Sequence, residues 1–434
     1  MKTNWIIALL ASVIIYPGCA VAQQGKPDRN EQRIIKAIAD NYDRNIQVLK
    51  ESVNINSGSL NIQGVRATGD HLAKEFQKIG FKTEWVELPD SLKRAGHLVA
   101  YKKGTKGKRV MMIGHLDTVF EPDMEANPFR MLNDSVATGQ GISDMKGGNV
   151  VILAACQALE QLGLLKDATV IAYFTGDEES TGKPYQVTRR DFIERGQEID
   201  VALGFEGAAG LGEVVVGRRG IGSWTVNVEA NQGHSSTIFG KIGYGAAYEM
   251  GRILNEFRLR LAGIRNLTLN PGIVVAGVDI NAGTEENEFM DVTGKMNIVA
   301  PRAVSTGDLR YLTNAQRDSA RNIMKEIVSN SLPGTKATIT FNDGFPGMEP
   351  TAGNVDLVRQ LNEVSMDLGY GPVKGGDPGS RGAGDISWIT QYTDCIDGLG
   401  AEGAGAHAPG EVIYFNTYRP LMERAAVLLY RLTR

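Results

Sequence analysis

The feature that most constrains this chain is a set of short apolar runs that end on histidine or carboxylate residues. His115 closes the run MMIGH, Glu178 and Glu179 follow the apolar run 169–174, and Glu206 follows the run 201–205. Such runs, alternating with helical patterns, are typical of buried parallel strands covered on both faces. Polar residues at the ends of these strands are held at one edge of the sheet. The sequence therefore predicts an α/β fold with a mostly parallel sheet, helices on both faces and a polar site at one edge.

The pattern changes after the segment GRRG, which ends at Gly220. Beyond it, strands are expected at 223–229, 273–280, 294–298 and 335–341, and helices at 245–261 and 314–330. This order indicates a small α+β insertion whose sheet has one open face. We expect a signal peptide at 1–22, a catalytic domain at 23–219 and 343–434, and the inserted lid or dimerisation domain at 220–342.

The N-terminus has the pattern of a secretory signal peptide. Lys2 supplies the positive start, the run 5–16 is apolar, and the sequence Ala-Val-Ala at 20–22 matches a cleavage site. Cys19 raises the alternative of lipoprotein processing, which the preceding Tyr16 and Pro17 fit poorly, and an uncleaved anchor is a further alternative. Under each alternative the protein is exported, either secreted or periplasmic, and cleavage leaves no membrane segment.

Charge and cysteine content exclude several classes of function. The net charge is −4, which offers no electrostatic basis for binding nucleic acid or an anionic membrane surface. Cleavage of the signal peptide leaves only Cys156 and Cys395, too few for a disulfide framework. We expect these two residues to be buried free thiols.

Five residues of metal-ligand type lie in separate motifs: His115, Asp144, Glu179, Glu206 and His407. Taken singly, each has an ordinary alternative as a strand-end, turn, cap or loop residue. Together, two imidazoles and three carboxylates suit two divalent cations, with zinc the first candidate. Asp117 follows His115 by two residues along an extended segment, so its side chain could accept the second ring N–H of that histidine.

These motifs, in this order, resemble one enzyme family. The segments HLDTV, GISDMKGG, GDEES and FEG, followed by a distal GAGAH and Glu411, resemble the zinc-dependent exopeptidases related to glutamate carboxypeptidase. That family includes aminoacylases, carnosinases and the acetylornithine and succinyl-diaminopimelate deacylases. The resemblance implies two Zn²⁺ ions per chain, one held by His115 and Glu206 and the other by Glu179 and His407. Asp144 would bridge the two ions, with a cis peptide bond after it, and Glu178 would be the general base.

The resemblance also extends to the insertion and to a late glycine-rich loop. It implies that His234 reaches the active site of a partner chain in a homodimer and stabilises an oxyanion there. It further implies that Asn297 and Arg310 contact substrate, and that Gly384 lies in a loop facing the site. Gly233 replaces the alanine usual before that histidine, and the loop SRGAGD departs from the usual Gly-Ser-Asp.

The function expected from the sequence is that of an exported di-zinc carboxypeptidase. Its substrates would be peptides, and an activated water would attack the amide bond with Glu178 taking its proton. An aminoacylase-like enzyme acting on N-acyl amino acids is the first alternative. A non-catalytic exported binding protein with a vestigial metal site is the second.

Overall fold

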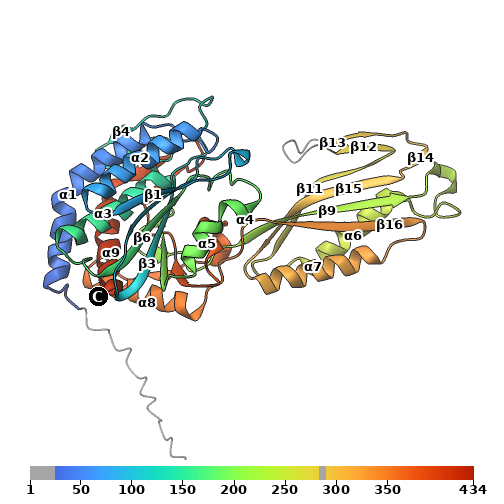
Figure 1. The fold of residues 1–434 in the computed structure, drawn as a ribbon. Coiled ribbons are helices and arrows are strands. Elements are labelled where there is room, and N and C mark those ends of the chain that lie inside the picture. Colours follow the sequence, from blue (N-terminus) through green and yellow to red (C-terminus); the bar gives the residue numbers. More distant parts are fainter. Residues whose placement is uncertain (1–24, 283–289) are drawn as a thin grey trace, which may run out of the picture.

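The structure is a computed structural model that describes residues 25–282 and 290–434. The expected signal peptide, 1–22, and Cys19 lie outside the described residues. Within the described ranges, no helix is both long enough and apolar enough to cross a membrane. Figure 1 shows a larger lobe built from the early and late parts of the sequence, from which a long, narrow lobe projects.

A twisted six-stranded sheet forms the centre of the larger lobe. Its strands, in spatial order, are β1 (Lys82–Val86), β2 (His97–Lys102), β6 (Ala168–Thr175), β3 (Lys106–His115), β7 (Val201–Gly204) and β18 (Asp394–Ile396). The last four strands run parallel to one another, and β2 pairs antiparallel with both β1 and β6. The predicted mostly parallel sheet is confirmed, with an antiparallel pair at one edge.

Helices cover both faces of this sheet. The helices of the larger lobe are α1 (Arg29–Val53), α2 (Ile62–Lys78), α3 (Gly147–Gln161), α4 (Tyr185–Thr188), α5 (Arg190–Gly196), α8 (Ala352–Asp367) and α9 (Phe415–Thr433). Successive residues of β3 point to opposite faces, so Val110 and Met112 join one buried cluster while Met111 and Ile113 join another. A strand buried on both sides must be apolar throughout, which explains the continuous run before His115.

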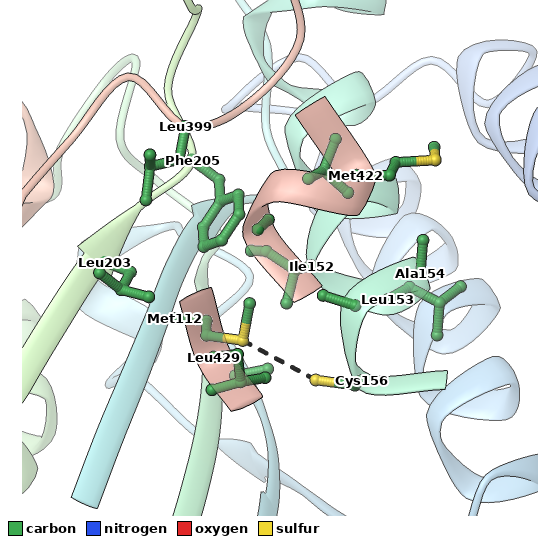
Figure 2. Close-up of a cluster of buried hydrophobic side chains, with 14 of the residues drawn as sticks. Met112, Ile152, Leu153, Ala154, Cys156, Leu203, Phe205, Leu399, Met422 and Leu429 are labelled. Atoms are coloured by element: carbon green, nitrogen blue, oxygen red, sulfur yellow. Dashed lines mark hydrogen bonds between the residues drawn. The ribbon is translucent and has the colours of Figure 1, made fainter. Parts of the chain in front are cut away.

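The larger of the two buried clusters beside the central sheet lies between the sheet and the helices α3 and α9. Figure 2 shows Ile152 and Cys156 of α3 facing Met112 of β3, with Leu429 of α9 beside them. The Cys156 sulfur lies 3.8 Å from the Met112 sulfur. Cys156 and Cys395 are both buried free thiols, as expected. This packing anchors the strand that ends on His115.

A second, small sheet carries the last candidate ligand. Its strands are β19 (Gly403–Ala404), β20 (Val412–Tyr414), β5 (Val136–Thr138) and β4 (Arg130–Asn133), in this spatial order. His407 lies in the connection between β19 and β20. The two-residue strands β8 (Glu213–Val214) and β17 (Lys374–Gly375) pair with each other nearby. These short strands were not expected from the sequence.

The projecting lobe is a four-stranded antiparallel sheet with two helices on one face (Figure 1). Its strands, in spatial order, are β11 (Thr268–Gly277), β15 (Arg302–Tyr311), β9 (Gly220–Ala230) and β16 (Thr335–Asp343), and its helices are α6 (Gly245–Leu261) and α7 (Asn314–Ser329). Two small antiparallel strand pairs, β10 (Gly233–His234) with β14 (Ile298–Val299) and β12 (Asp279–Ala282) with β13 (Met290–Thr293), complete it. Burial alternates along β9, as a sheet with one open face requires.

One strand prediction in this lobe is wrong. The segment 294–297 forms no strand, and Met296 within the expected strand 294–298 is fully exposed. The strand of the main sheet is β15, which pairs with β11 on one side and β9 on the other. Gly307 and Asp308 weaken the β-pattern of this segment, but its two neighbours supply the pairing that its composition does not.

Candidate metal centre

Five separate segments bring the five candidate ligands to the carboxyl ends of the parallel strands. His115 is the last residue of β3, Glu179 lies after β6, and Glu206 lies just beyond β7. Asp144 belongs to the turn that leads into α3, and His407 belongs to the loop between β19 and β20. Parallel strands have their carboxyl ends at the same edge of a sheet. The parallel arrangement of β3, β6 and β7 is therefore enough to bring their three ligand-bearing segments together.

The ligand atoms fall into two groups that share Asp144. In the first group, His115 Nε2 lies 3.2 Å from Asp144 Oδ1 and 3.7 Å from Glu206 Oε1. In the second, His407 Nε2 lies 3.1 Å from Asp144 Oδ2 and 3.2 Å from Glu179 Oε2. Each group can offer three ligand atoms that lie within 4.8 Å of one another. The two oxygens of Asp144 thus face different histidines.

The turn that carries Asp144 is clamped by Glu411. The buried Glu411 carboxylate accepts hydrogen bonds from the backbone N–H groups of Gly141 (2.9 Å), Ser143 (2.7 Å) and Asp144 (2.9 Å), and from the Ser143 hydroxyl (2.9 Å). The Asp144–Met145 peptide bond is cis, as the resemblance implied. Glu411 therefore fixes the backbone from which Asp144 reaches both histidines.

Asp117 supports the site differently from what its sequence position suggested. His115 Nδ1 lies 2.9 Å from the backbone carbonyl oxygen of Asp117, whereas the nearer carboxylate oxygen is 3.5 Å away. The carboxylate instead accepts the backbone N–H groups of Glu178 and Glu179, each at 3.0 Å, and the Ser59 hydroxyl at 2.6 Å. Asp117 thus orients the histidine through its main chain and the two glutamates through its side chain.

The buried ion pair of Arg218 and Asp397 supports the backbone of Glu206. The Arg218 guanidinium donates to Asp397 through Nε at 2.7 Å, and Asp397 accepts the Glu206 backbone N–H at 3.3 Å. Arg218 Nη1 also donates to the carbonyls of Gly382 (3.1 Å) and Ala383 (3.0 Å). A Cβ on Gly384 would lie 3.0 Å from Arg218 Nη1, so Gly384 packs tightly against this guanidinium.

The carboxylates of the site are buried close to one another with too little positive charge nearby to keep their pKa values in the usual range. Burial raises the pKa of Glu178 well above its usual range, and the Glu206 carboxylate adds to the shift. Burial, with Asp144 next, raises the pKa of Glu206 to about 8. Hydrogen bonding to Asp144 and Glu179 raises the pKa of His407 to about 10. Without further cations, these groups would have to hold protons at neutral pH.

The donor set fits divalent cations. Two ligand atoms on one tetrahedral zinc with bonds of about 2.0–2.1 Å are roughly 3.3 Å apart, close to the separations within both groups. The Oε1 atom of Glu179 is buried without a hydrogen-bond partner among the described residues, which a cation bound by this carboxylate would compensate. Imidazole nitrogen and carboxylate oxygen are also the ligands that borderline cations prefer.

A cavity of about 400 Å³ opens beside the two groups. Glu178, Glu206 and His407 line it, together with Ser380 and Arg381 of the late glycine-rich loop. Glu178 therefore faces the same space as the ligand residues. In the late glycine-rich loop, Gly382 and Ala383 line the cavity, whereas the next residue, Gly384, packs against Arg218.

Three of the expected site residues, His234, Asn297 and Arg310, belong to the projecting lobe and do not line this cavity within a single chain. His234 and Asn297 are exposed and adjacent, since the Ser235 N–H donates to the Asn297 carbonyl at 3.0 Å. They lie beside β14, at the end of the projecting lobe far from the larger lobe (Figure 1). Arg310 lies near the base of that lobe, where its Nε donates to Asp308 at 2.9 Å.

Several supporting residues were missed in the sequence. Ser59 precedes Asp117 by 58 residues, and the buried Arg189, which bonds Asp177 and Asp385, lies in no recognisable motif. Arg218 was visible only as part of GRRG. Buried charge pairs depend on contacts between distant segments, so local patterns could not identify them.

Two comparisons relate the sequence to known proteins. A profile described as Peptidase family M20/M25/M40 matches residues 111–432. Carboxypeptidase G2 of Pseudomonas sp. (strain RS-16) is 27% identical over 412 residues, covering 93% of this chain and 91% of that protein.

Two solved structures show the same fold. Aminopeptidase PepT from Bacillus cereus superposes with a TM-score of 0.70 at 16% identity, covering 90% of this chain and 99% of that one. The YXEP protein of Bacillus subtilis, described as a dinuclear metal binding peptidase, has a TM-score of 0.63 at 15% identity, with coverages of 91% and 99%. The family profile spans most of the chain, including all five candidate ligands. The chain therefore belongs to peptidase family M20/M25/M40 and is a metallopeptidase.

Proposed function

We propose that this enzyme is an exported carboxypeptidase that uses two zinc ions per chain to release a C-terminal amino acid from a peptide. The observation that carries the proposal is the placement of Asp144 between two His–Glu pairs, with Glu178 facing the same cavity. Similarity to carboxypeptidase G2 over nearly the whole chain supports the direction of cleavage. The description of the Bacillus subtilis relative as a dinuclear metal binding peptidase supports two ions.

In this proposal His115 and Glu206 would hold one ion, Glu179 and His407 would hold the other, and Asp144 would serve both. Two such cations, when bound, polarise an amide carbonyl and acidify water. The chain positions the ligands through Glu411, which fixes the Asp144 backbone, and through Asp117, which fixes the turn of the two glutamates.

Glu178 is the proposed general acid and base. Its carboxylate takes a proton from the attacking water and later delivers that proton to the nitrogen of the departing amino acid. Burial raises its pKa, so the group holds a proton more readily than an exposed glutamate does. Glu178 can act in this way because it lies in the cavity wall but belongs to neither three-residue group.

His234 and Asn297 would act through a second chain. We propose that the projecting lobe forms a homodimer in which His234 and Asn297 of one chain approach the cavity of the other. Both residues are exposed, and the nearby exposed Phe239 and Tyr248 rings, 5.2 Å apart, offer apolar surface for a partner. Arg310 would bind the substrate carboxylate if the substrate displaced Asp308.

A substrate panel combined with metal analysis tests the proposal. Mature protein purified without chelator should contain about two zinc ions per chain and hydrolyse blocked dipeptides faster than N-acetyl amino acids. The reverse order of kcat/KM would establish an N-acyl amino acid deacylase instead. Bound metal without hydrolysis of either class would favour a binding protein. Full activity with one ion per chain would contradict the bridging role of Asp144.

A further inference from the structure

The late glycine-rich loop reads SRGAGD where the resemblance implies Gly-Ser-Asp, and its Arg381 lies in the wall of the cavity beside the candidate ligands. Two guanidinium groups line that cavity. Arg218 is held by other groups of the chain, since its Nε donates to Asp397 and its Nη1 donates to two loop carbonyls. The Arg381 side chain has no hydrogen bond or ion pair with any residue that the structure describes.

The backbone around Arg381 is held in place. Arg218 bonds the carbonyls of the next two residues, Gly382 and Ala383, and the Arg219 N–H donates to the Arg381 carbonyl at 3.3 Å. Asp377 caps the turn that precedes it through the Gly379 N–H at 3.0 Å. A half-buried guanidinium is therefore presented from a fixed loop toward the space where substrate would lie.

The charges around this space favour an anionic partner for Arg381. The carboxylates of the wall, Asp144, Glu178, Glu179 and Glu206, belong to the metal centre and its proton carrier. None of them pairs with Arg381. A guanidinium offers two parallel N–H donors that match the two oxygens of a carboxylate, and carboxylates are the usual anionic groups of peptides.

We propose that Arg381 is a specificity-determining residue that binds a carboxylate of the substrate, an inference that rests on the proposed hydrolase function. The carboxylate is either an acidic side chain or the C-terminal carboxylate. Arg381 is separate from Arg310, which lies on the projecting lobe and pairs with Asp308.

Matched ligands distinguish these two sources. Blocked dipeptides ending in Glu or Gln differ in one side-chain carboxylate, and blocked dipeptides ending in alanine or alaninamide differ in the terminal carboxylate. For Arg381→Gln we expect kcat/KM to fall about 10–100-fold on the acidic member of one pair, mainly through KM, with little change on its neutral partner. Arg381→Lys should retain part of the selectivity, because it keeps the charge but loses the planar fork.

A binding measurement separates this inference from the proposed function. Affinities of the same peptides are measured by calorimetry on Glu178→Gln protein, with and without Arg381→Gln, where turnover is not needed. Loss of affinity confined to the carboxylate member supports the inference even if the wild type hydrolyses none of the panel. Lys374→Gln, an exposed charge outside the cavity lining, controls for net charge, and unfolding temperature controls for folding. An equal loss within both matched pairs, or no loss in either pair, would overturn the role of Arg381.

Discussion

The two ends of the proposed active site are built in opposite ways. In the larger lobe, the segments that carry candidate ligands are fixed by buried hydrogen bonds from distant parts of the chain, as Glu411 and Asp117 show. At the end of the projecting lobe, His234 is exposed, and its ring Nδ1 lies 2.8 Å from the hydroxyl of Ser236, only two residues away. The metal centre is thus preorganised within one chain, whereas the tip is exposed and partnered locally.

This difference indicates which steps depend on assembly. Binding of metal requires rigid ligands, and the larger lobe supplies them alone. Any contribution from His234 requires a second chain or a large movement of the lobe. Variants in the larger lobe should therefore act in each chain separately, and variants at the tip should act through the partner.

The largest expected effect is in the larger lobe, at the adjacent pair Glu178 and Glu179. Glu178→Gln should lower kcat by about 10²–10⁴-fold while bound metal stays near the wild-type level, because only the proton carrier is lost. Glu179→Gln is the matched control and should lose metal. Steady-state kinetics and elemental analysis measure both properties. Equal metal loss in the two variants would refute the separation of their roles.

The next effect concerns the tip. His234→Ala should lower kcat by about 10²–10³-fold if its imidazole stabilises the oxyanion in the partner's site. Mixing this variant with Glu178→Ala protein should restore activity, since one site of the mixed dimer then contains both groups. Light scattering must first show a dimer and exchange of subunits. A fully active monomer, or no recovery of activity after subunit exchange, would show that His234 does not act in the active site of a partner chain.

The general plan of the larger lobe could be predicted from the sequence because its signals are local. Continuous apolar runs such as the one ending at His115 identify buried strands, and ligand-type residues at their ends meet at one sheet edge. The strand β15 was missed because its pairing on both sides, and not its composition, forms it. The hydrogen bond of His115 to the Asp117 carbonyl was likewise inaccessible, because side-chain spacing does not reveal which oxygen of a residue is nearer.

A smaller effect is expected at Asp117, whose carboxylate positions the turn of the two glutamates. Asp117→Asn keeps the backbone carbonyl that faces His115 but weakens the carboxylate that accepts the two glutamate N–H groups. We expect metal affinity or activity to fall about 10–100-fold, as is typical for groups that orient ligands. Ser59→Ala removes only one of the hydrogen bonds to Asp117 and should cost less. Metal titration of both variants gives the comparison, and a larger loss for Ser59→Ala would contradict it.

The smallest effect is on stability and lies beneath the site. His97 is fully buried, where its ring accepts the Gly176 N–H at 3.2 Å and contacts the Thr188 carbonyl at 2.8 Å. Burial lowers its pKa despite the nearby Asp177, and Arg189 lowers it further. The folded protein therefore keeps this ring neutral at pH values where the unfolded chain, with a histidine pKa of about 6.5, already binds a proton.

The sign of the pH effect follows from this difference. Above about pH 6.5 the ring is neutral in both states and adds no pH dependence. Below it the unfolded state binds more protons, so the free energy of unfolding falls as pH falls, by at most about 1.4 kcal/mol per pH unit. His97→Gln should be less stable at neutral pH because it disturbs two buried hydrogen bonds, but its stability should decline less steeply between about pH 6.5 and 5. Denaturant unfolding across this range measures the slope, and equal slopes for the two proteins would show that His97 does not stay neutral in the folded state.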